Sequence, residues 1–122
     1  MNFDWKEYLT LAERLQMDGG QACFRSSISR AYYAAFCIAR DKVGLKDYEP
    51  QRLGDVPIHK KVIFTLRDSK KMSEKETSLI LDQLRKMRND ADYLAEMTVT
   101  SDYVDRAISK SKEILQKISL ST

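Results

Sequence analysis

The segment from Gln21 to Val43 constrains the fold of this chain more than any other. Apolar side chains recur along it at the three- and four-residue spacing of an α-helix. They form one stripe of Phe24, Ile28, Ala31, Ala35 and Ile38, which Tyr32, Ala39 and Val43 widen. Because the part from Ala31 to Phe36 is apolar nearly all round, we expect this helix at the centre of a bundle or in a homodimer interface.

Four further helices are predicted on either side of it. Each has an apolar stripe and a start or stop signal, such as Gly19 after the first helix or Pro57 in the first turn of the third. Ser73 and Glu76 have the spacing of a capping box, so we expect Ser73 to cap the fourth helix. The predicted helices are 4–17, 57–68, one from Ser73 past Leu94, and one that Thr100 or Ser101 caps and that reaches the C-terminus.

The connections between these helices indicate how they pack. Most are short, and the longest irregular stretch is 44–56, a length that is often functional or mobile. Few glycines and prolines interrupt the chain. We therefore expect one domain over residues 1–122, folded as an all-α up-and-down bundle of four to five helices.

Composition narrows the cellular setting and the class of partner. The formal net charge of +3 is compatible with nucleic acid but does not argue for it. On one helix, Cys23 and Cys37 would lie about 21 Å apart, too far for a disulfide, which favours a reducing compartment. The N-terminus lacks a signal peptide, and no stretch approaches the roughly 18 apolar residues of a membrane span. We expect a cytoplasmic protein with no membrane partner.

Most familiar catalytic and cofactor motifs are missing from the sequence. It has no glycine-rich phosphate loop, no nucleophile elbow and no HExxH pair. His59 is the single histidine, which excludes a zinc site of paired cysteines and histidines and leaves little room for a Ser/His/Asp triad. We expect neither a metal nor a cofactor.

The strongest polar concentration lies on the fourth predicted helix. Arg85 and Arg88 stand three residues apart, so together they can hold a phosphate. Asn89 and Tyr93 also share a face. In the alternative interpretation, Arg88 pairs with Asp92 and Arg85 is simply a solvated surface residue.

Two further groups have a structural alternative as well. Ser26, Ser27, Ser29 and Arg30 lie on the long apolar helix, where a buried hydrogen-bond network is the simpler interpretation. His59, at the start of the third helix, can serve as a proton shuttle or a phosphate ligand, or can simply pack.

Several of these residues together resemble a known family. The run 29–36, Ser-Arg-Ala-Tyr-Tyr-Ala-Ala-Phe, followed by Ala39, resembles the signature helix of the HEPN superfamily, named from higher eukaryotes and prokaryotes, nucleotide-binding. His59 with its apolar neighbours, then the run 84–93 and a closing amphipathic helix, follow in the family's order. The similarity covers essentially the whole chain.

The resemblance implies a helical bundle that forms a homodimer. It also implies pairing with a small MNT-type nucleotidyltransferase, in a toxin–antitoxin or defence module. In the catalytic branch of the family, an Arg-x(4–6)-His motif cleaves RNA where two domains meet. Arg88 and Asn89 match the start of that motif, but Tyr93 stands at the position of the histidine.

This tyrosine separates three functional hypotheses. With a pKa near 10, tyrosine is a poor general base, although it can stack on a nucleic-acid base. Five residues also turn a helix by about 140°, so Arg88 and Tyr93 converge only through long side chains or across a dimer. His59 can replace the missing histidine only if the fold brings it near Arg88.

The leading hypothesis is a partner protein that binds a nucleotidyltransferase, RNA or nucleotide through the surface of the fourth helix. Its contact residues are Arg85, Arg88, Asn89 and Tyr93, with His59 and Arg30 as further phosphate contacts. The second is a metal-independent ribonuclease with Arg88, Asn89 and Tyr93 in the catalytic site. The third is a structural dimerisation module, which is favoured if Arg85 and Arg88 both pair with carboxylates.

Overall fold

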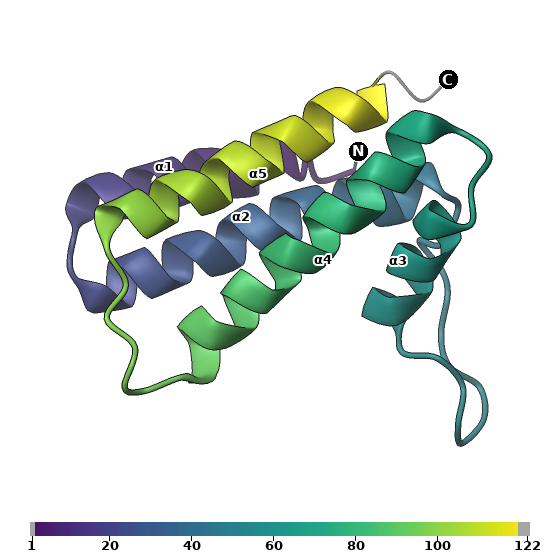
Figure 1. Ribbon diagram of the computed structural model, residues 1–122, viewed down its shortest axis with the longest axis horizontal. Helices are drawn as coiled ribbons and strands as arrows, with labels where there is room; N and C mark the ends of the chain where they lie inside the picture. Colours follow the sequence, from purple (N-terminus) through teal and green to yellow (C-terminus); the bar gives the residue numbers. More distant parts are fainter. Residues whose placement is uncertain (1, 120–122) are drawn as a thin grey trace.

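The computed structural model describes residues 2–119 and contains five α-helices within that range, with no β-strand there. They are α1 (Lys6–Asp18), α2 (Gln21–Lys42), α3 (Ile58–Arg67), α4 (Met72–Tyr93) and α5 (Ser101–Ser119). The helices pack as a bundle (Figure 1), which confirms the predicted all-α fold. The prediction that the last helix reaches the C-terminus concerns residues 120–122, which lie outside the described part.

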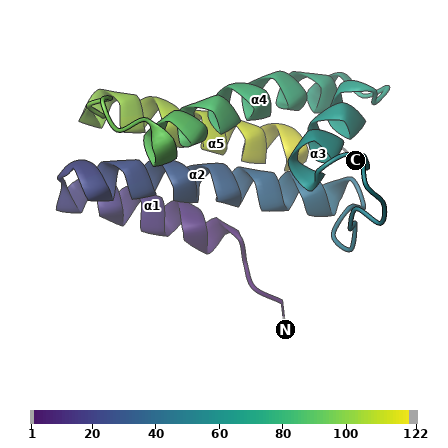
Figure 2. The same cartoon turned by 90° about the horizontal axis from the view of Figure 1, so that it is seen from below.

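The bundle has two layers, which Figure 2 shows edge-on. One layer holds α1 and α2, the other holds α4 and α5, and the short α3 lies at one end beside α4. Helix α2 contacts each of the other four helices, whereas α1 and α4 do not contact one another. The predicted central position of the apolar helix is therefore confirmed.

Small side chains let the neighbours of α2 approach its backbone. Ala31, Ala34, Ala35 and Ala39 are completely buried. Two serines fix the packing through backbone carbonyls: Ser27 Oγ donates to the oxygen of Ala12 in α1 at 2.6 Å, and Ser111 Oγ of α5 donates to that of Ala31 at 2.8 Å. Because all these atoms are buried, the bonds satisfy polar groups that water cannot reach.

The helix ends follow most of the sequence signals. Gly19 ends α1 with a positive φ of 77°, a conformation that glycine adopts without strain. Thr100 Oγ1 accepts a hydrogen bond from the Tyr103 amide at 3.1 Å, so Thr100 is the cap of α5. The predicted Ser73 cap is wrong: α4 already begins at Met72, because Ser69 Oγ accepts the Lys71 amide and closes the turn earlier.

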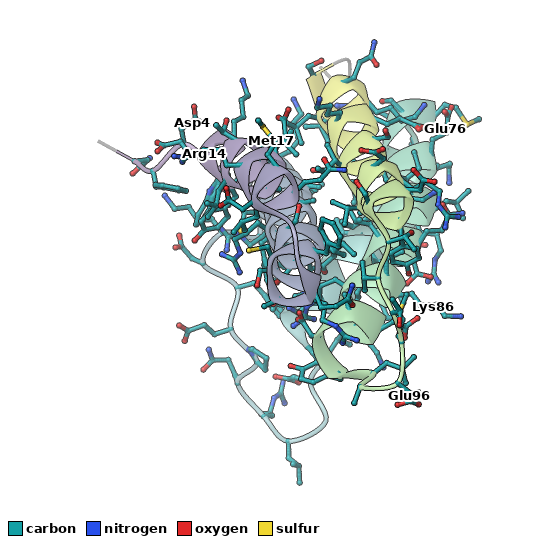
Figure 3. The ribbon with its side chains drawn as sticks, turned by 90° about the vertical axis from the view of Figure 1, so that its left-hand side faces the viewer. Asp4, Arg14, Met17, Glu76, Lys86 and Glu96 are labelled. Carbon is teal, nitrogen blue, oxygen red and sulfur yellow. The ribbon has the colours of Figure 1, made fainter. Side chains whose placement is uncertain are left out.

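The long connection between α2 and α3 extends away from the bundle (Figures 1 and 3). Asp55 shapes its tip, since one carboxylate oxygen accepts the amides of Gln51 and Arg52 at 2.8 Å each. Tyr48 donates to the carbonyl oxygen of Val56 at its base. The predicted irregular stretch is thus an ordered loop whose tip presents a fully exposed Leu53.

The structure also bears on the expectations about the two cysteines and about membrane-spanning helices. Cys23 and Cys37 both lie in α2 and are free thiols, with Cys37 buried and Cys23 half-buried. Among residues 2–119, no helix is long and apolar enough to cross a membrane.

Candidate functional site

Helices α2, α3 and α4 bring the predicted site residues together at one junction. Tyr32, Tyr33 and Phe36 come from adjacent positions on α2, and His59 comes from the first turn of α3. Arg85 and Arg88 come from successive turns of α4. We call this group the tyrosine–arginine cluster; its members are Tyr32, Tyr33, Phe36, His59, Arg85 and Arg88. The cluster contains the motif arginine and the single histidine, which lie far apart in the sequence.

Tyr32 and His59 form the buried part of the cluster. The Tyr32 hydroxyl and His59 Nδ1 are 2.6 Å apart, a short hydrogen bond. The imidazole also stacks on Phe36 with 4.4 Å between ring centres, and on Tyr32 at 5.6 Å. Burial raises the pKa of Tyr32 well above its ordinary range, so its hydroxyl stays protonated. His59 is therefore held in a fixed orientation by three contacts.

The surroundings of His59 keep its ring neutral. Burial, followed by the positive charges of Arg85 and Arg88, lowers the pKa of His59 to about 4. Its Nε2 forms no hydrogen bond with any residue between 2 and 119, so the atom is available to a ligand. A general acid or base at neutral pH needs a pKa close to that pH, and His59 does not have one.

Arg88 lies across the aromatic side of the cluster and is tightly restrained. Its guanidinium carbon is 5.2 Å from the centre of the Tyr33 ring and 5.8 Å from that of Tyr32. Nε donates to Asp92 at 2.9 Å, and Nη1 donates to Asn89 at 2.8 Å. The predicted pairing of Arg88 with Asp92 is therefore confirmed, and only part of its guanidinium edge is left for a ligand.

Arg85 is held quite differently from Arg88. Its Nε is buried and has no hydrogen-bond partner among the described residues, and no carboxylate there forms an ion pair with it. The alternative that Arg85 is a simply solvated surface residue is wrong, because the side chain is half-buried beside Tyr32 and His59. A buried donor without an acceptor costs about 1–3 kcal/mol.

Arg85 is also accessible from the outer side of α4. There it lines a shallow hollow, and the other lining residues are Asp82, Gln83, Lys86 and Asn89. Lys86 projects outward from this helix (Figure 3). The predicted pair Arg85 and Asn89 thus shares one accessible depression, with Arg88 on the inner side of the same helix.

Tyr93 and Arg30 extend the site at its edges. Tyr93 is 77 % exposed at the end of α4, and the centre of its ring lies 6.0 Å from the guanidinium carbon of Arg88. The two side chains converge within one chain despite their spacing on the helix. Arg30 lies over Tyr33 at 5.2 Å and over Tyr8 of α1 at 4.6 Å, so it shares the Tyr33 ring with Arg88.

Of the serines on α2, one has the structural role that the sequence favoured and another does not, and two aromatic residues of the site were not predicted. Ser27 has the structural role that the sequence favoured, because its buried hydroxyl binds a backbone carbonyl, whereas Ser26 is exposed. Phe36 was not predicted as a site residue, although it stands four residues after Tyr32 and therefore shares its face. Tyr8, the second ring under Arg30, comes from another helix and has no sequence signal.

The chain matches no protein-family model, no curated protein and no solved structure. What the geometry establishes is a five-helix bundle in which arginine, tyrosine and histidine side chains converge.

Proposed function

We propose that this protein binds RNA or nucleotide phosphate through Arg85 and Arg88, as the HEPN-like component of a prokaryotic toxin–antitoxin or defence module. The observation that carries the proposal is the Arg85 guanidinium, which has no carboxylate partner among the described residues and lines the hollow on α4. Arginine presents its donors in a planar fork that matches phosphate oxygens. The module and the family rest on the sequence resemblance, and the surroundings of Arg85 and Arg88 in the structure support the proposed phosphate site.

The neighbours of Arg85 supply what a nucleic-acid ligand requires. The neutral His59 lies close enough to Arg85 and Arg88 for both charges to lower its pKa, so a further polar group stands beside the two arginines. The exposed Tyr93 ring offers a surface on which a base can stack. A structural dimerisation module, the third hypothesis, is less favoured because Arg85 is not neutralised by a carboxylate.

The test is binding of a fluorescein-labelled single-stranded RNA to the wild-type protein and to Arg85→Gln. Hydrogen bonds to charged groups are worth about 1.5–3 kcal/mol, so we expect the variant to bind roughly 10- to 100-fold more weakly. Arg106→Gln is the matched control, since Arg106 also lies over a tyrosine ring, that of Tyr103, but on α5. Equal affinity of wild type and Arg85→Gln would refute the proposal.

Metal-independent RNA cleavage is a second candidate function, and one observation favours it. The fold places His59 beside Arg85 and Arg88, so a histidine is present where the Arg-x4-Tyr motif lacks one. Against it, a histidine with a pKa of about 4 is hardly ever protonated at neutral pH and is a weak base. We therefore place binding ahead of catalysis.

Incubation of the purified protein with RNA in the presence of a chelator separates these two functions. We expect no cleavage by the wild-type protein. Cleavage that is lost in Arg88→Ala and in His59→Ala, and reduced in Tyr93→Phe, would establish the ribonuclease and overturn our preference. Cleavage that persists in Arg88→Ala would indicate a contaminating nuclease.

The protein partner we propose is a small MNT-type nucleotidyltransferase, which the HEPN resemblance implies. The natural test is the gene beside the one for this chain. If that gene encodes such an enzyme, co-expression with a tag on one protein should recover both in a defined ratio. Failure of the two to co-purify would remove the enzyme as a partner and leave the RNA proposal unaffected.

A further inference from the structure

The net positive charge of the chain is concentrated in α3 and the turn that follows it. Residues 58–75 contain six lysines and arginines but two carboxylates, a formal charge of +4, whereas the whole chain carries +3. The remainder of the molecule is therefore slightly acidic. Figure 1 shows this segment at one end of the bundle, where α3 lies beside α4.

Five of these basic side chains are exposed. One of them, Lys71, lies 4.0 Å from a carboxylate oxygen of Glu74. We call the other four the α3 surface: Lys60, Arg67, Lys70 and Lys75. Lys60 and Arg67 lie on one face of α3, about 10 Å apart along the axis at about 1.5 Å per residue. Lys75 of α4 donates to the Arg67 carbonyl at 3.0 Å, which brings it to the end of α3. Lys70 lies in the turn between them.

The α3 surface is poorly neutralised by acidic side chains. Its one ion pair among the described residues joins Arg67 to Asp68 at 3.4 Å, with both side chains more than half exposed. Pairs of that kind contribute about 0–1 kcal/mol and are easily replaced by another anion. Between Lys60 and Arg67, the exposed Phe64 ring lies 4.6 Å from the Arg67 guanidinium carbon. An aromatic ring between cations is an arrangement that suits single-stranded nucleic acid.

The α3 surface adjoins the tyrosine–arginine cluster along the sequence of α3. His59 belongs to the tyrosine–arginine cluster, and Lys60 is the next residue in the same turn of α3. From the geometry we propose that an RNA strand bound at Arg85 runs on along α3, with its phosphates at Lys60, Arg67, Lys70 and Lys75. This inference rests on the proposed function, because one strand occupies both surfaces.

Oligonucleotide length distinguishes the two sites. A uridine trinucleotide can fill the Arg85 site alone, whereas a uridine 12-mer can reach the α3 surface as well. In a Lys60→Gln/Arg67→Gln/Lys75→Gln variant, we expect the 12-mer to bind at least 10-fold more weakly and the trinucleotide to bind as in wild type. For single strands each phosphate contact adds about 0.7 to the slope of log affinity against log salt, so that slope should fall by about 2.

The matched control removes three charges elsewhere, from exposed side chains of α1 and α5: Lys6→Gln, Arg14→Gln and Lys112→Gln. Figure 3 shows Arg14 on the α1 side of the molecule, away from Lys86 on α4. Circular dichroism confirms that both triple variants are folded. If the control weakens the 12-mer equally, net charge and not a defined path explains the effect, and the inference is overturned.

Failure of this inference is distinguishable from failure of the proposed function. Unchanged 12-mer affinity in the α3 variant, together with weaker binding of both oligonucleotides by Arg85→Gln, overturns the path along α3 and leaves the phosphate site intact. Weaker 12-mer binding by the α3 variant with no effect of Arg85→Gln overturns the proposed site at Arg85 and the continuous strand with it.

Discussion

Asp92 occupies the Nε edge of Arg88, which is an edge that a phosphate would otherwise take. The pair is 2.9 Å long and spans one helical turn. Such an i,i+4 pair stabilises a helix by about 0.3–0.5 kcal/mol, so its loss hardly affects folding. Its larger effect is on the charge that Arg88 presents to a ligand.

We therefore predict that Asp92→Asn binds RNA more tightly than wild type. Removing the carboxylate frees the Arg88 guanidinium and removes a negative charge from the site, which should raise the affinity by about 2- to 10-fold, on the order of 1 kcal/mol. Fluorescence anisotropy at constant salt measures this. Glu113→Gln, which removes one exposed carboxylate of α5, is the control. Unchanged or weaker binding by Asp92→Asn would show that Arg88 does not contact the RNA.

His59 gives the stability of the protein a dependence on pH. Its pKa is about 4 in the folded chain against an ordinary value of 6.5, so the unfolded chain binds the proton more tightly. The contribution of the neutral His59 ring to the free energy of unfolding is therefore fully present above pH 6.5. It is lost as the pH falls from 6.5 towards 4.

Urea unfolding at pH 7 and at pH 5 should therefore show a decrease in the free energy of unfolding for wild type. In His59→Gln this decrease should be smaller, because glutamine does not titrate. The two-dimensional NMR signal of the His59 ring should titrate near pH 4 in the wild-type protein. An ordinary midpoint near 6.5 would show that neither burial nor the charges of Arg85 and Arg88 act on the ring.

At the scale of the element, α2 is held against α1 by a buried polar contact as well as by apolar packing. Ser27 is buried and its hydroxyl binds the Ala12 carbonyl, whereas its neighbour Ser26 is exposed. The two serines thus form a matched pair, since they have the same side chain on the same helix at different depths.

We predict that Ser27→Ala destabilises the bundle by about 0.5–1.5 kcal/mol, since it removes a buried hydrogen bond between α2 and the Ala12 carbonyl of α1. Ser26→Ala should change the free energy of unfolding by less than about 0.5 kcal/mol, as surface substitutions usually do. Chemical denaturation of both variants decides the point. Equal effects would mean that Ser27 has no structural role.

The elements themselves follow closely from the sequence, and the site only in part. The helices and most of their ends were predicted from local signals. The apolar stripe predicted α2, and Gly19 and Thr100 marked the end of α1 and the start of α5. Ser73 failed as a cap because Ser69, a few residues earlier, closes the turn first. The contact between His59 and Tyr32 could not be predicted from the sequence, because it depends on how α3 packs against α2 and α4.

In the tyrosine–arginine cluster, the sequence also could not predict the environment of each individual side chain. The spacing of Arg85 and Arg88 predicted a basic spot, but it did not show that one arginine is paired and the other is not. That difference arises because Arg85 and Arg88 face different neighbours although they stand on successive turns. It leaves Arg85, and not Arg88, without an ion-pair partner among residues 2–119.

At the scale of the whole molecule, one side of α2 remains uncovered. Helices α1 and α4 flank it without touching one another. Ser29 and Tyr33 are half-buried there, and Ser26 is exposed. The HEPN resemblance implies a homodimer, and this side adjoins the tyrosine–arginine cluster.

We predict that the protein is a dimer at micromolar concentration and that Ser26→Arg/Ser29→Arg shifts it to a monomer, because two added cations on each copy would repel across the interface. Light scattering after size-exclusion chromatography measures both states. A double substitution to alanine controls for the loss of the hydroxyls. A strictly monomeric wild-type protein would contradict the prediction.

The loop that presents Leu53 has a consequence for how the chain can be divided. It is the single covalent link between a half made of α1 and α2 and a half made of α3, α4 and α5. Most of the apolar surface of α2 is buried against helices of the other half. A break in the backbone at this loop would leave two fragments with complementary faces. The bundle is thus suited to use as a split reporter, in which reassembly of the fragments signals that two fused proteins have met.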